Sequence, residues 1–486
     1  MDVILDLPLY KIIGDTAERM GFRAYVVGGV VRDYFLGRHC TDIDVVAVGR
    51  GDGDHSVGIA LATAVAHEID PDKHVNVFRN FGTASFVYHH DGEQMQIEFV
   101  GARKESYSRG SRKPFVEDGT LEDDQNRRDF TINDMAVSLN SDTFGQLVDP
   151  FGGIRDLDKG ILRTPLDPDI TFSDDPLRMM RAVRFASQLN FHIEPATFDA
   201  IVRNVNRMEI VSRERIAVEL NKIMLSPRPS VGLKLMMDSG LMQVIMPDFA
   251  RLKGVESMSG KAHKDNFFHT LQVLDNVASK SDNLWLRWAA ALHDIGKPGT
   301  KRFDEHQGWT FHGHEVRGSN MVKRIFKSLR LPLDANLRYV QKLVLLHMRP
   351  IVLSEDIVTD SAVRRLLFEA GDDIDDLMIL CEADITSKNE EKVRKYMKNF
   401  SIVRQKLVEI EEKDRIRNFQ PPISGMDIMK TFGIEPCHEI GVIKDAIKDA
   451  ILDGKIPNER EPAYRMMLEQ GALLGLKPIA SDTAHI

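Results

Sequence analysis

The sequence predicts a multidomain α+β protein, with a mixed α/β head at its N-terminus and all-helical domains after it. Its 486 residues are too many for a single ordinary core. From about Tyr10 to Pro150, short β-branched runs alternate with polar turns, which is typical of a mixed α/β domain. After Thr171, apolar residues recur every three or four positions, as they do on the buried face of a helix.

The head is predicted to begin with a strand, a glycine turn and a helix. Further strands are expected where apolar and β-branched residues form short runs. The strands are predicted at Tyr25–Val27, Ile43–Val48, Val75–Phe78, Ala84–Tyr88 and Met95–Val100, and the helix at Val30–Leu36.

The helical part is divided by two proline-containing breaks, Ser226–Ser230 and Asn418–Ser424. A histidine-rich helical stretch is predicted between them, from about His263 to Asp384. The last part is helical and charged, with a loop near Gly433 to Cys437. We therefore expect four domains, at residues 1–150, 151–255, 256–394 and 395–486.

The composition is that of an ordinary soluble globular protein, with 43% hydrophobic and 28% charged residues. No basic segment precedes an apolar stretch, and no apolar run reaches membrane-spanning length. The three cysteines, Cys40, Cys381 and Cys437, form no C-x-x-C pair, which favours a reducing cytoplasm and disfavours a thiolate zinc site. A formal net charge of −9 disfavours a non-specific nucleic-acid binder, so an RNA substrate would need local Arg and Lys patches.

The most informative segment of the head joins a glycine turn to a pair of aspartates. Gly28 and Gly29 lie between a strand and a helix, where backbone N–H groups can approach phosphate oxygens closely. Asp42 and Asp44 are two residues apart at the start of a strand, so both carboxylates can face the same divalent ions. Together these groups predict an Mg²⁺-dependent phosphoryl or nucleotidyl transfer site.

Other residues of the head are candidates for the same site. Glu98 ends a strand-like run, where a third catalytic carboxylate and a solvent-facing strand end are equally compatible with the sequence. The candidate triphosphate and ribose contacts are Arg103, Arg127, Arg128 and Asp129, with a solvated charge run as the alternative for Arg127 and Arg128.

A row of charges follows a predicted helix start at Pro176. The row contains Asp175, Arg178, Arg181 and Arg184, and its three-residue spacing places neighbours close together on the helix surface. An exposed row of ion pairs would have the same spacing. A carboxylate beside a guanidinium, however, matches the amino group and ring acceptor of cytosine and adenine, and mismatches uracil and guanine. Asp175 and Arg178 could therefore select CTP and ATP.

Five of these segments resemble the successive motifs of the bacterial class II CCA-adding enzyme and poly(A) polymerase family. The motifs are GGVVRD, TDID, RRDFTIND, VDPFGGIRDL and DDPLRMMRAVRF, in family order over roughly residues 10–250. The resemblance implies a polymerase-β-like nucleotidyltransferase head, followed by an all-α neck that VDPFGGIRDL joins to it as a hinge. By position it places Gly29 and Arg32 on the triphosphate, Asp42 and Asp44 on Mg²⁺, Arg128 and Asp129 on the nucleotide, Asp175 and Arg178 on the base, and Arg181 and Arg184 near the phosphates.

Two residues depart from the motifs of this family. Asp174 stands where the family usually has Glu, which is a conservative change, and Asp134 stands where it usually has Ala. A carboxylate at position 134 is expected to disturb the packing behind the site. The segment Arg103–Glu122 would be the flexible loop that helps the enzyme to switch from CTP to ATP.

Seven of the sixteen histidines lie between His263 and His347. Their arrangement resembles the HD phosphohydrolase superfamily, in which histidines and aspartates from several helices bind divalent metal. The resemblance implies His269, His293, Asp294 and Asp384 as ligands, and His314 and His347 as the two extra histidines of dinuclear members. His and Asp ligands suit Mn²⁺, Ni²⁺, Fe²⁺ or Zn²⁺, with Mg²⁺ also compatible. His263, His306 and His312 match no ligand position.

The function implied is a template-independent tRNA nucleotidyltransferase that adds or repairs the 3′-terminal CCA of tRNA with CTP and ATP. The HD domain would remove 2′,3′-cyclic or terminal phosphates from damaged RNA ends. The tail from about Ile423 also resembles such enzymes and is expected to bind tRNA, although Pro436-Cys437 replaces the usual Pro-Gly. The alternatives are a poly(A) polymerase, a partial CC- or A-adding enzyme, and an HD phosphohydrolase whose head only binds RNA. Oligomeric state does not follow from the sequence.

Overall fold

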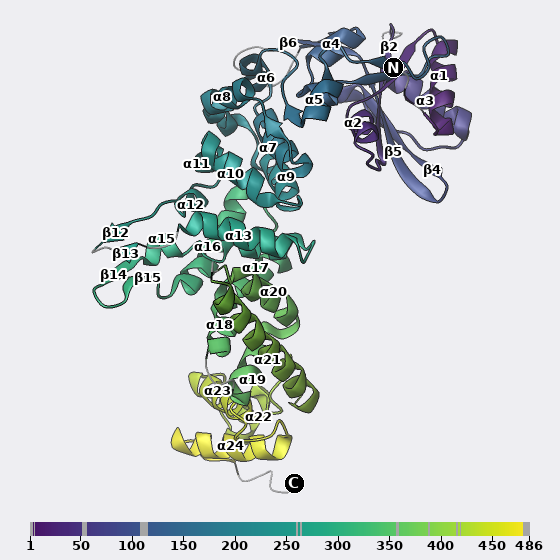
Figure 1. Ribbon diagram of the computed structural model, residues 1–486. Helices are drawn as coiled ribbons and strands as arrows, with labels where there is room; N and C mark the ends of the chain where they lie inside the picture. The colour runs from purple at the N-terminus through teal and green to yellow at the C-terminus, as the bar shows by residue number, and fades with distance from the viewer. Residues whose placement is uncertain are drawn as a thin grey trace. The chain divides into compact units, whose positions relative to one another are not determined.

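The computed structural model describes residues 3, 5–50, 56–106, 115–258, 261–262, 265–355, 359–386, 389–414, 417 and 419–479. The chain forms two compact units, Met1–Pro247 and Asp248–Ile486. Their elements are labelled in Figure 1. The first unit has an α/β head followed by helices, and the second is mainly helical, so the predicted multidomain α+β fold class is confirmed.

The head is built on a mixed seven-stranded sheet with strand order β3-β4-β5-β2-β1-β8-β9. The central strands β2 and β5 run parallel, and the other neighbours are antiparallel. The strands are β1 (Arg23–Val27), β2 (Asp42–Val48), β3 (Asn76–Phe78), β4 (Thr83–His90), β5 (Glu93–Gly101), β8 (Ala136–Ser138) and β9 (Leu147–Val148). All five strands predicted in the head are present, and none of their ends is shifted by more than two residues.

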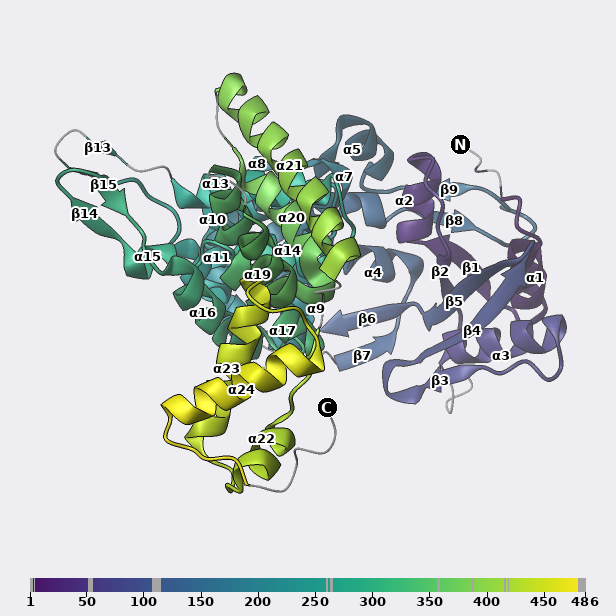
Figure 2. The ribbon, with the colours of Figure 1, turned by 90° about the horizontal axis from the view of Figure 1, so that it is seen from below.

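Two amphipathic helices, α1 (Pro8–Arg19) and α3 (Val57–Ile69), pack together beside this sheet (Figure 2). Along β2 the burial alternates at its start, so that Ile43 and Val45 are buried while Asp42 and Asp44 remain exposed. Because strand side chains alternate between the two faces, both aspartates lie on the same face of the sheet.

The first unit also contains a hairpin and several helices. A hairpin, β6 (Arg103–Ser106) and β7 (Phe115–Asp118), flanks residues 107–114 of the predicted flexible loop, which lie outside the described residues. The other elements are α2 (Gly29–Phe35), η1 (Arg79–Phe81), α4 (Leu121–Asn126), η2 (Thr131–Asn133), α5 (Gly153–Lys159), β10 (Ile161–Leu162), α6 (Pro168–Asp174), α7 (Leu177–Leu189), β11 (His192–Ile193), α8 (Pro195–Asn204), η3 (Val205–Ile210), α9 (Arg213–Met224), α10 (Pro229–Ser239) and α11 (Leu241–Ile245).

The second unit packs five helices around a core that includes Phe267, Trp288 and Phe326. These helices are α13 (Asn266–Ala278), α14 (Leu284–Leu292), α16 (His314–Leu329), α17 (Ala335–Leu346) and α20 (Ile374–Asp384). The other helices associated with this unit are α12 (Pro247–Ala250), α15 (Lys297–Thr300), α18 (Met348–Glu355), α19 (Asp360–Ala370), η4 (Gly371–Asp373), α21 (Glu390–Asp414), α22 (Gly425–Phe432), α23 (His438–Leu452) and α24 (Arg460–Leu473).

The helical stretch predicted from about His263 to Asp384 contains one strand pair that was not predicted, β14 (Arg302–Asp304) with β15 (Gly308–Thr310). Another short pair, β12 (Ser257–Met258) with β13 (Lys261–Ala262), lies just before this stretch. These hairpins project from the helices of the second unit (Figures 1 and 2). In the β14–β15 hairpin, the Asp304 carboxylate accepts backbone hydrogen bonds at the turn, and Phe303 packs edge-to-face on Trp309. A turn of this kind and a cross-strand aromatic pair stabilise a hairpin better than a helix.

Both predicted breaks and the loop near Gly433 to Cys437 separate helices in the structure, although Asn418 lies outside the described residues. No helix among the described residues has both the length and the apolar character needed to cross a membrane.

Candidate functional site

Three carboxylates of the head share one face of the sheet. In the parallel pairing of β2 with β5, Asp44 is directly opposite Glu98 and Asp42 is opposite Gln96. Enclosure by the surrounding pocket raises the pKa of Asp44 to about 6; Arg128 opposes this shift, and Glu98 and Asp42 add to it. Glu98 therefore lies beside Asp42 and Asp44, where it can act as a third carboxylate of the same group. The ligand atoms of these three residues do not all come within 4.8 Å of one another. Carboxylates gathered in this way are the donor set that Mg²⁺ prefers, so these residues fit the ion.

The turn between β1 and α2 requires glycine at position 28. Gly28 has φ 77°, a conformation that side-chain-bearing residues rarely adopt. A Cβ there would lie 3.2 Å from Nη1 of Arg128 and 3.5 Å from Oδ2 of Asp44. The missing side chain thus leaves the space between the carboxylate strand and the arginine open.

A cavity of about 420 Å³ opens beside this turn. It brings together most of the residues predicted to contact the nucleotide. Its lining consists of Gly28, Gly29, Arg32, Asp44, Arg127, Arg128, Asp129, Asn133, Asp175, Leu177, Arg178, Arg181, Phe185 and Arg215.

Two arginines at one end of the cavity are held by buried or half-buried partners. Arg32 pairs with Asp33 at 2.8 Å and donates to the side-chain oxygen of Asn133 at 2.8 Å. Arg128 pairs at 2.8 Å with Asp124, which also binds Arg127. Burial would raise the pKa of Asp124, but the two guanidinium groups hold it below its usual range. Arg127 and Arg128 are thus anchored to one buried carboxylate, which excludes the alternative of a freely solvated charge run.

A second group of arginines surrounds the ring of Phe185. The guanidinium carbons of Arg184, Arg32 and Arg181 lie 4.1, 5.1 and 5.4 Å from the ring centroid. Arg181 also pairs with the buried carboxylate of Asp129. Cation–π contacts and the ion pair hold these side chains in place before any ligand binds.

Asp175 and Arg178, predicted to lie side by side on one helix, have other partners in the structure. Asp175 ends α6 in an extended conformation and pairs with Arg215 of α9 at 3.0 Å. Arg178 donates instead to the backbone carbonyl groups of Thr171 and Arg127. The three-residue spacing was misleading because Asp175 lies before the first turn of α7, outside the helix. Arg215 was missed, since nothing in the sequence distinguishes it from an ordinary arginine on a helix surface.

Two other predicted nucleotide contacts lie outside the cavity lining. Arg184 is buried and pairs with Glu219 at 2.6 Å. Arg103 donates to the backbone oxygen of Phe81 at 3.0 Å. A direct contact of either residue with a nucleotide stays a prediction.

Asp134 follows Asn133 of the cavity lining and is buried, and neither of its carboxylate oxygens has a hydrogen-bond partner. Burial raises its pKa to about 8; Arg128 opposes this shift, while Asp124, Asp149 and Asp129 add to it. The folded state therefore binds the Asp134 proton more tightly than the unfolded chain does.

We expect this residue to make stability fall as pH rises from about 4 to about 8. A group whose pKa is raised by folding contributes stability that is fully present below its pKa in the unfolded chain. This stability is lost as the pH rises through its pKa in the folded protein. The free energy of unfolding of Asp134→Ala, relative to that of the parent, should therefore be about 2–4 kcal/mol higher at pH 8 than at pH 5. Urea unfolding at both pH values measures this difference, and Asp134→Asn should show the same dependence on pH as Asp134→Ala. A gain that does not change with pH would contradict the assignment.

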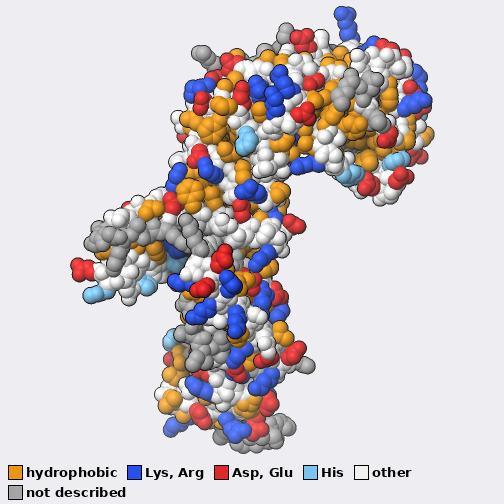
Figure 3. Space-filling view, viewed as in Figure 1, with side chains coloured by type: hydrophobic (Ala, Val, Ile, Leu, Met, Phe, Trp, Pro, Cys, Tyr) orange, Lys and Arg blue, Asp and Glu red, His pale blue; other side chains and the backbone are white. Residues whose placement is uncertain are grey.

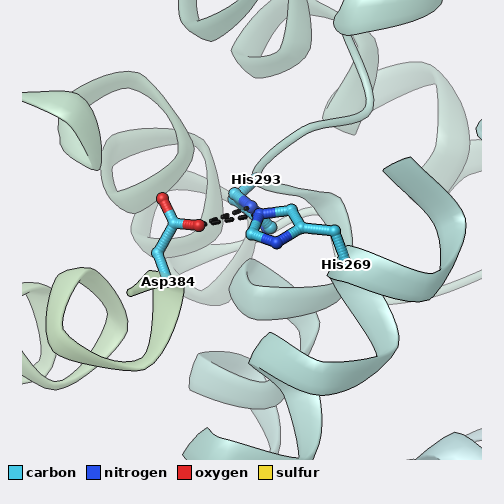
Figure 4. A group of neighbouring side chains, drawn as sticks. All are labelled: His269, His293 and Asp384. Atoms are coloured by element: carbon cyan, nitrogen blue, oxygen red, sulfur yellow. Dashed lines mark ion pairs between the residues drawn. The ribbon is translucent and has the colours of Figure 1, made fainter. Parts of the chain in front are cut away.

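The second unit holds all six predicted HD residues in two neighbouring trios. Ligand atoms of His269, His293 and Asp384 lie within 4.8 Å of one another, and so do those of Asp294, His314 and His347. In the first trio, Oδ1 of Asp384 lies 2.8 Å from Nε2 of His269 and 3.6 Å from Nε2 of His293 (Figure 4). In the second, Nε2 of His314 is 3.4 Å from Asp294. The ligands come from five helices or their ends: α13, α14, α16, α17 and α20.

Backbone groups fix the orientation of three of these rings. The Nδ1 atoms of His293, His314 and His347 lie 2.7, 2.9 and 2.7 Å from backbone carbonyl oxygens and must donate to them. In a neutral ring this leaves the lone pair on Nε2. The Nε2 atoms of His314 and His347 then face each other at 3.2 Å, and Nε2 of His293 has no hydrogen-bond partner. Lone pairs that converge in this way fit a divalent cation, with the carbonyl groups as outer partners of its ligands.

The histidines predicted to lie outside the ligand set take no part in either trio. His306 and His312 are exposed, and His263 lies outside the described residues.

Comparisons with known proteins agree with this architecture. Three family models match the chain: "Poly A polymerase head domain" at residues 24–163, "Probable RNA and SrmB- binding site of polymerase A" at 190–253, and "HD domain" at 266–389. The multifunctional CCA protein of Nitrosospira multiformis is 34% identical over 322 residues, covering 64% of this chain and 70% of that protein. The A-adding tRNA nucleotidyltransferase of Deinococcus radiodurans is 29% identical over 449 residues, covering 90% and 93%.

A solved structure has the same fold. The Thermotoga maritima CCA-adding enzyme complexed with tRNA superposes with a TM-score of 0.58 at 22% identity, covering 96% of this chain and 95% of that one. The nucleotidyltransferase head and the HD domain expected from the sequence are thereby confirmed. With its glycine turn, carboxylate face and HD metal residues in one chain, this protein belongs to the CCA-adding tRNA nucleotidyltransferase family.

Proposed function

We propose that this chain adds or repairs the 3′-terminal CCA of tRNA, using CTP and ATP without a nucleic-acid template. One observation carries the proposal: a strand bearing Asp42 and Asp44 borders an arginine-lined cavity at a glycine turn. Family membership gives this geometry its substrate class. A tRNA substrate also implies that the enzyme works in the cytoplasm.

The residues of the cavity and of the carboxylate face have different roles in the proposed reaction. The Gly28–Gly29 turn, Arg32, Arg128 and Arg181 bind the triphosphate, since guanidinium groups pair with phosphate oxygens bidentately. Asp42 and Asp44, with Glu98 beside them, would hold two Mg²⁺ ions, which would supply Lewis acidity for the transfer of the nucleotide. The tRNA 3′-hydroxyl attacks the α-phosphorus in line, and pyrophosphate leaves.

We assign selection of the base to Asp175 and Arg178, although they do not touch each other in this structure. Both line the cavity, with Arg215 beside them. Asp175 offers an acceptor to the amino group of cytosine or adenine, and either arginine offers a donor to the ring nitrogen. Uracil and guanine leave these groups unsatisfied.

Asp175→Asn should therefore relax nucleotide choice by about tenfold, because an amide can also donate to the carbonyl oxygen of uracil or guanine. The measurement is the rate of UTP and GTP incorporation relative to CTP and ATP. Asp169→Asn is the matched control, since Asp169 is a helix-α6 carboxylate paired with Arg203 away from the cavity. An unchanged ratio in the Asp175 variant, whatever its rate, would remove this residue from base selection.

Addition of A alone is the second candidate, because the Deinococcus relative that spans most of this chain is named an A-adding enzyme. The two activities differ on one substrate. A tRNA that ends before CCA receives C residues from an enzyme that adds the whole CCA, whereas an A-adding enzyme extends only a tRNA that already ends in CC. Single-turnover incorporation on both tRNAs, with each nucleoside triphosphate separately, distinguishes them and detects a poly(A) polymerase by its unlimited product.

We further propose that the HD domain hydrolyses 2′,3′-cyclic or terminal phosphates on RNA ends. Its two trios would hold Mn²⁺, Ni²⁺, Fe²⁺, Zn²⁺ or Mg²⁺, which supplies Lewis acidity for attack of water on the phosphoester. Removing such phosphates would expose the hydroxyl that the head extends. A phosphohydrolase with a merely RNA-binding head is disfavoured by the carboxylate face, which RNA binding does not require.

We divide the chain into a head, a neck, an HD domain and a tail at residues 150, 255 and 394, and assign tRNA binding to the tail. On the face shown in Figure 3, basic and acidic side chains are interspersed instead of forming one positive field. Together with the net charge of −9, this favours contact with tRNA through local arginine and lysine groups.

A further inference from the structure

A second charged cavity, of about 610 Å³, lies in the unit Asp248–Ile486 and has no part in the functions above. We call it the arginine pocket. Its charged and polar side chains come from α12 and the turn after it, from α15 and from α16: Asp248, Arg251, Thr300, Arg317, Asn320 and Arg324.

The arginine pocket carries uncompensated positive charge. Arg324 pairs with Asp248 at 2.8 Å, so these two charges offset each other. Among the described residues, Arg251 and Arg317 form no side-chain hydrogen bond or ion pair. Two free guanidinium groups in one cavity, in a chain with a formal net charge of −9, call for an anionic ligand.

The backbone is shaped to receive Arg317. A Cβ at Gly299 would lie 2.3 Å from Nε and 2.4 Å from Cζ of Arg317, so a side chain at position 299 would displace this guanidinium group. The guanidinium group therefore lies directly over the backbone of α15. This contact limits the conformations of Arg317 before a ligand binds and lowers the entropy cost of binding.

The arginine pocket adjoins the metal centre through two segments of chain. Ile295 lines the pocket and directly follows Asp294, while Gly313 lines it and directly precedes His314. These segments pack tightly, since a Cβ at Gly296 would lie 2.2 Å from the backbone oxygen of His314. Helix α16 thus carries a metal-trio histidine and, one turn later, a free arginine.

We propose that the arginine pocket binds a backbone phosphate of the RNA whose end lies at the HD metal centre. Arg251 and Arg317 bind the phosphodiester oxygens, and Asn320 can donate a further hydrogen bond. This inference rests on the proposed phosphohydrolase function and gives it a substrate class: a polynucleotide end, in preference to a free nucleotide. Free phosphate shares the same chemistry, so the experiment must separate the two sources.

The test uses the full-length variant Arg251→Gln/Arg317→Gln, with Arg338→Gln as the matched control because Arg338 is an exposed arginine of α17 outside this pocket. Phosphate release is measured from a short RNA ending in a 2′,3′-cyclic phosphate and from a 2′,3′-cyclic mononucleotide. Losing two charge-assisted contacts should raise KM for the RNA about tenfold or more and leave kcat nearly unchanged. The mononucleotide has no neighbouring phosphate, so its hydrolysis should not change.

Binding of the same RNA tests the pocket independently of hydrolysis. The slope of log K against log salt concentration should become shallower by about 0.7 in the double variant, the value expected for one lost phosphate contact on a single strand. Gly299→Ala should give part of this effect by displacing Arg317. If the parent protein releases no phosphate but the slope still changes, the phosphohydrolase function fails and the RNA contact stands.

Three results would overturn the proposal. The first is an unchanged KM and salt slope for RNA. The second is an equal loss on the RNA and on the mononucleotide, which would place the reacting phosphate itself in the pocket. The third is calorimetric binding of inorganic phosphate that the double variant loses while its RNA binding is intact, which would make free phosphate the ligand.

Discussion

Asp42→Ala should abolish nucleotide incorporation into tRNA, with a loss of about a thousandfold or more. The substitution removes one of the two carboxylates that hold Mg²⁺ at the reacting phosphate. A metal contribution of about 4 kcal/mol to transition-state stability corresponds to three orders of magnitude in rate. Single-turnover incorporation of CTP and ATP measures the effect.

The fold should survive this change, because the Asp42 side chain is exposed at the first position of β2. Asp15→Ala is the matched control, since Asp15 is an exposed aspartate of α1 remote from the carboxylate strand. The thermal midpoint of both variants should match that of the parent. Incorporation that persists in the Asp42 variant at a tenth of the parent rate would reject the assigned chemistry.

His293→Ala should abolish phosphate release from RNA ends while leaving nucleotide incorporation intact. The substitution removes Nε2 of the first trio, which lies 3.6 Å from Asp384 of the same trio and 3.3 Å from Asp294 of the second. Phosphate release with Mn²⁺ or Ni²⁺ measures the activity, and elemental analysis of the purified protein should show less bound metal than in the parent.

Because His293 is fully buried, the variant needs a check on folding. Asp384→Asn offers a second substitution of nearly equal volume, and His312→Ala is the control, since this exposed histidine lies outside both trios. Normal incorporation by the head in each variant would show that the chain has folded. Release that continues in both His293→Ala and Asp384→Asn would exclude the trios as the hydrolytic centre.

The local parts of the head could be predicted from the sequence because they depend on short-range rules. The alternation of strand side chains placed Asp42 and Asp44 on one face, and the glycine pair marked the turn into α2. The role of Glu98 stayed open, because it depends on the parallel pairing of β2 with β5, more than fifty residues apart in sequence. No local pattern determines such a pairing.

The errors have a similar origin. Helical spacing predicted that Asp175 and Arg178 are neighbours on a helix surface, but the helix begins only at Leu177, and the partner of Asp175 is Arg215, forty residues later. In the second unit, the resemblance supplied the six ligands, yet their division into two trios depends on how five helices pack. The β14–β15 hairpin was missed because its short strands lie within a long helical pattern.

The central claim is that the head transfers nucleotides to a tRNA end with no template except its own side chains. Its most direct test is single-turnover extension, with purified protein and Mg²⁺, of a tRNA that ends before CCA. We predict addition of two C residues from CTP and one A from ATP, then arrest, with no product from UTP or GTP. No extension of this tRNA or of one ending in CC, by any nucleoside triphosphate, would contradict the account.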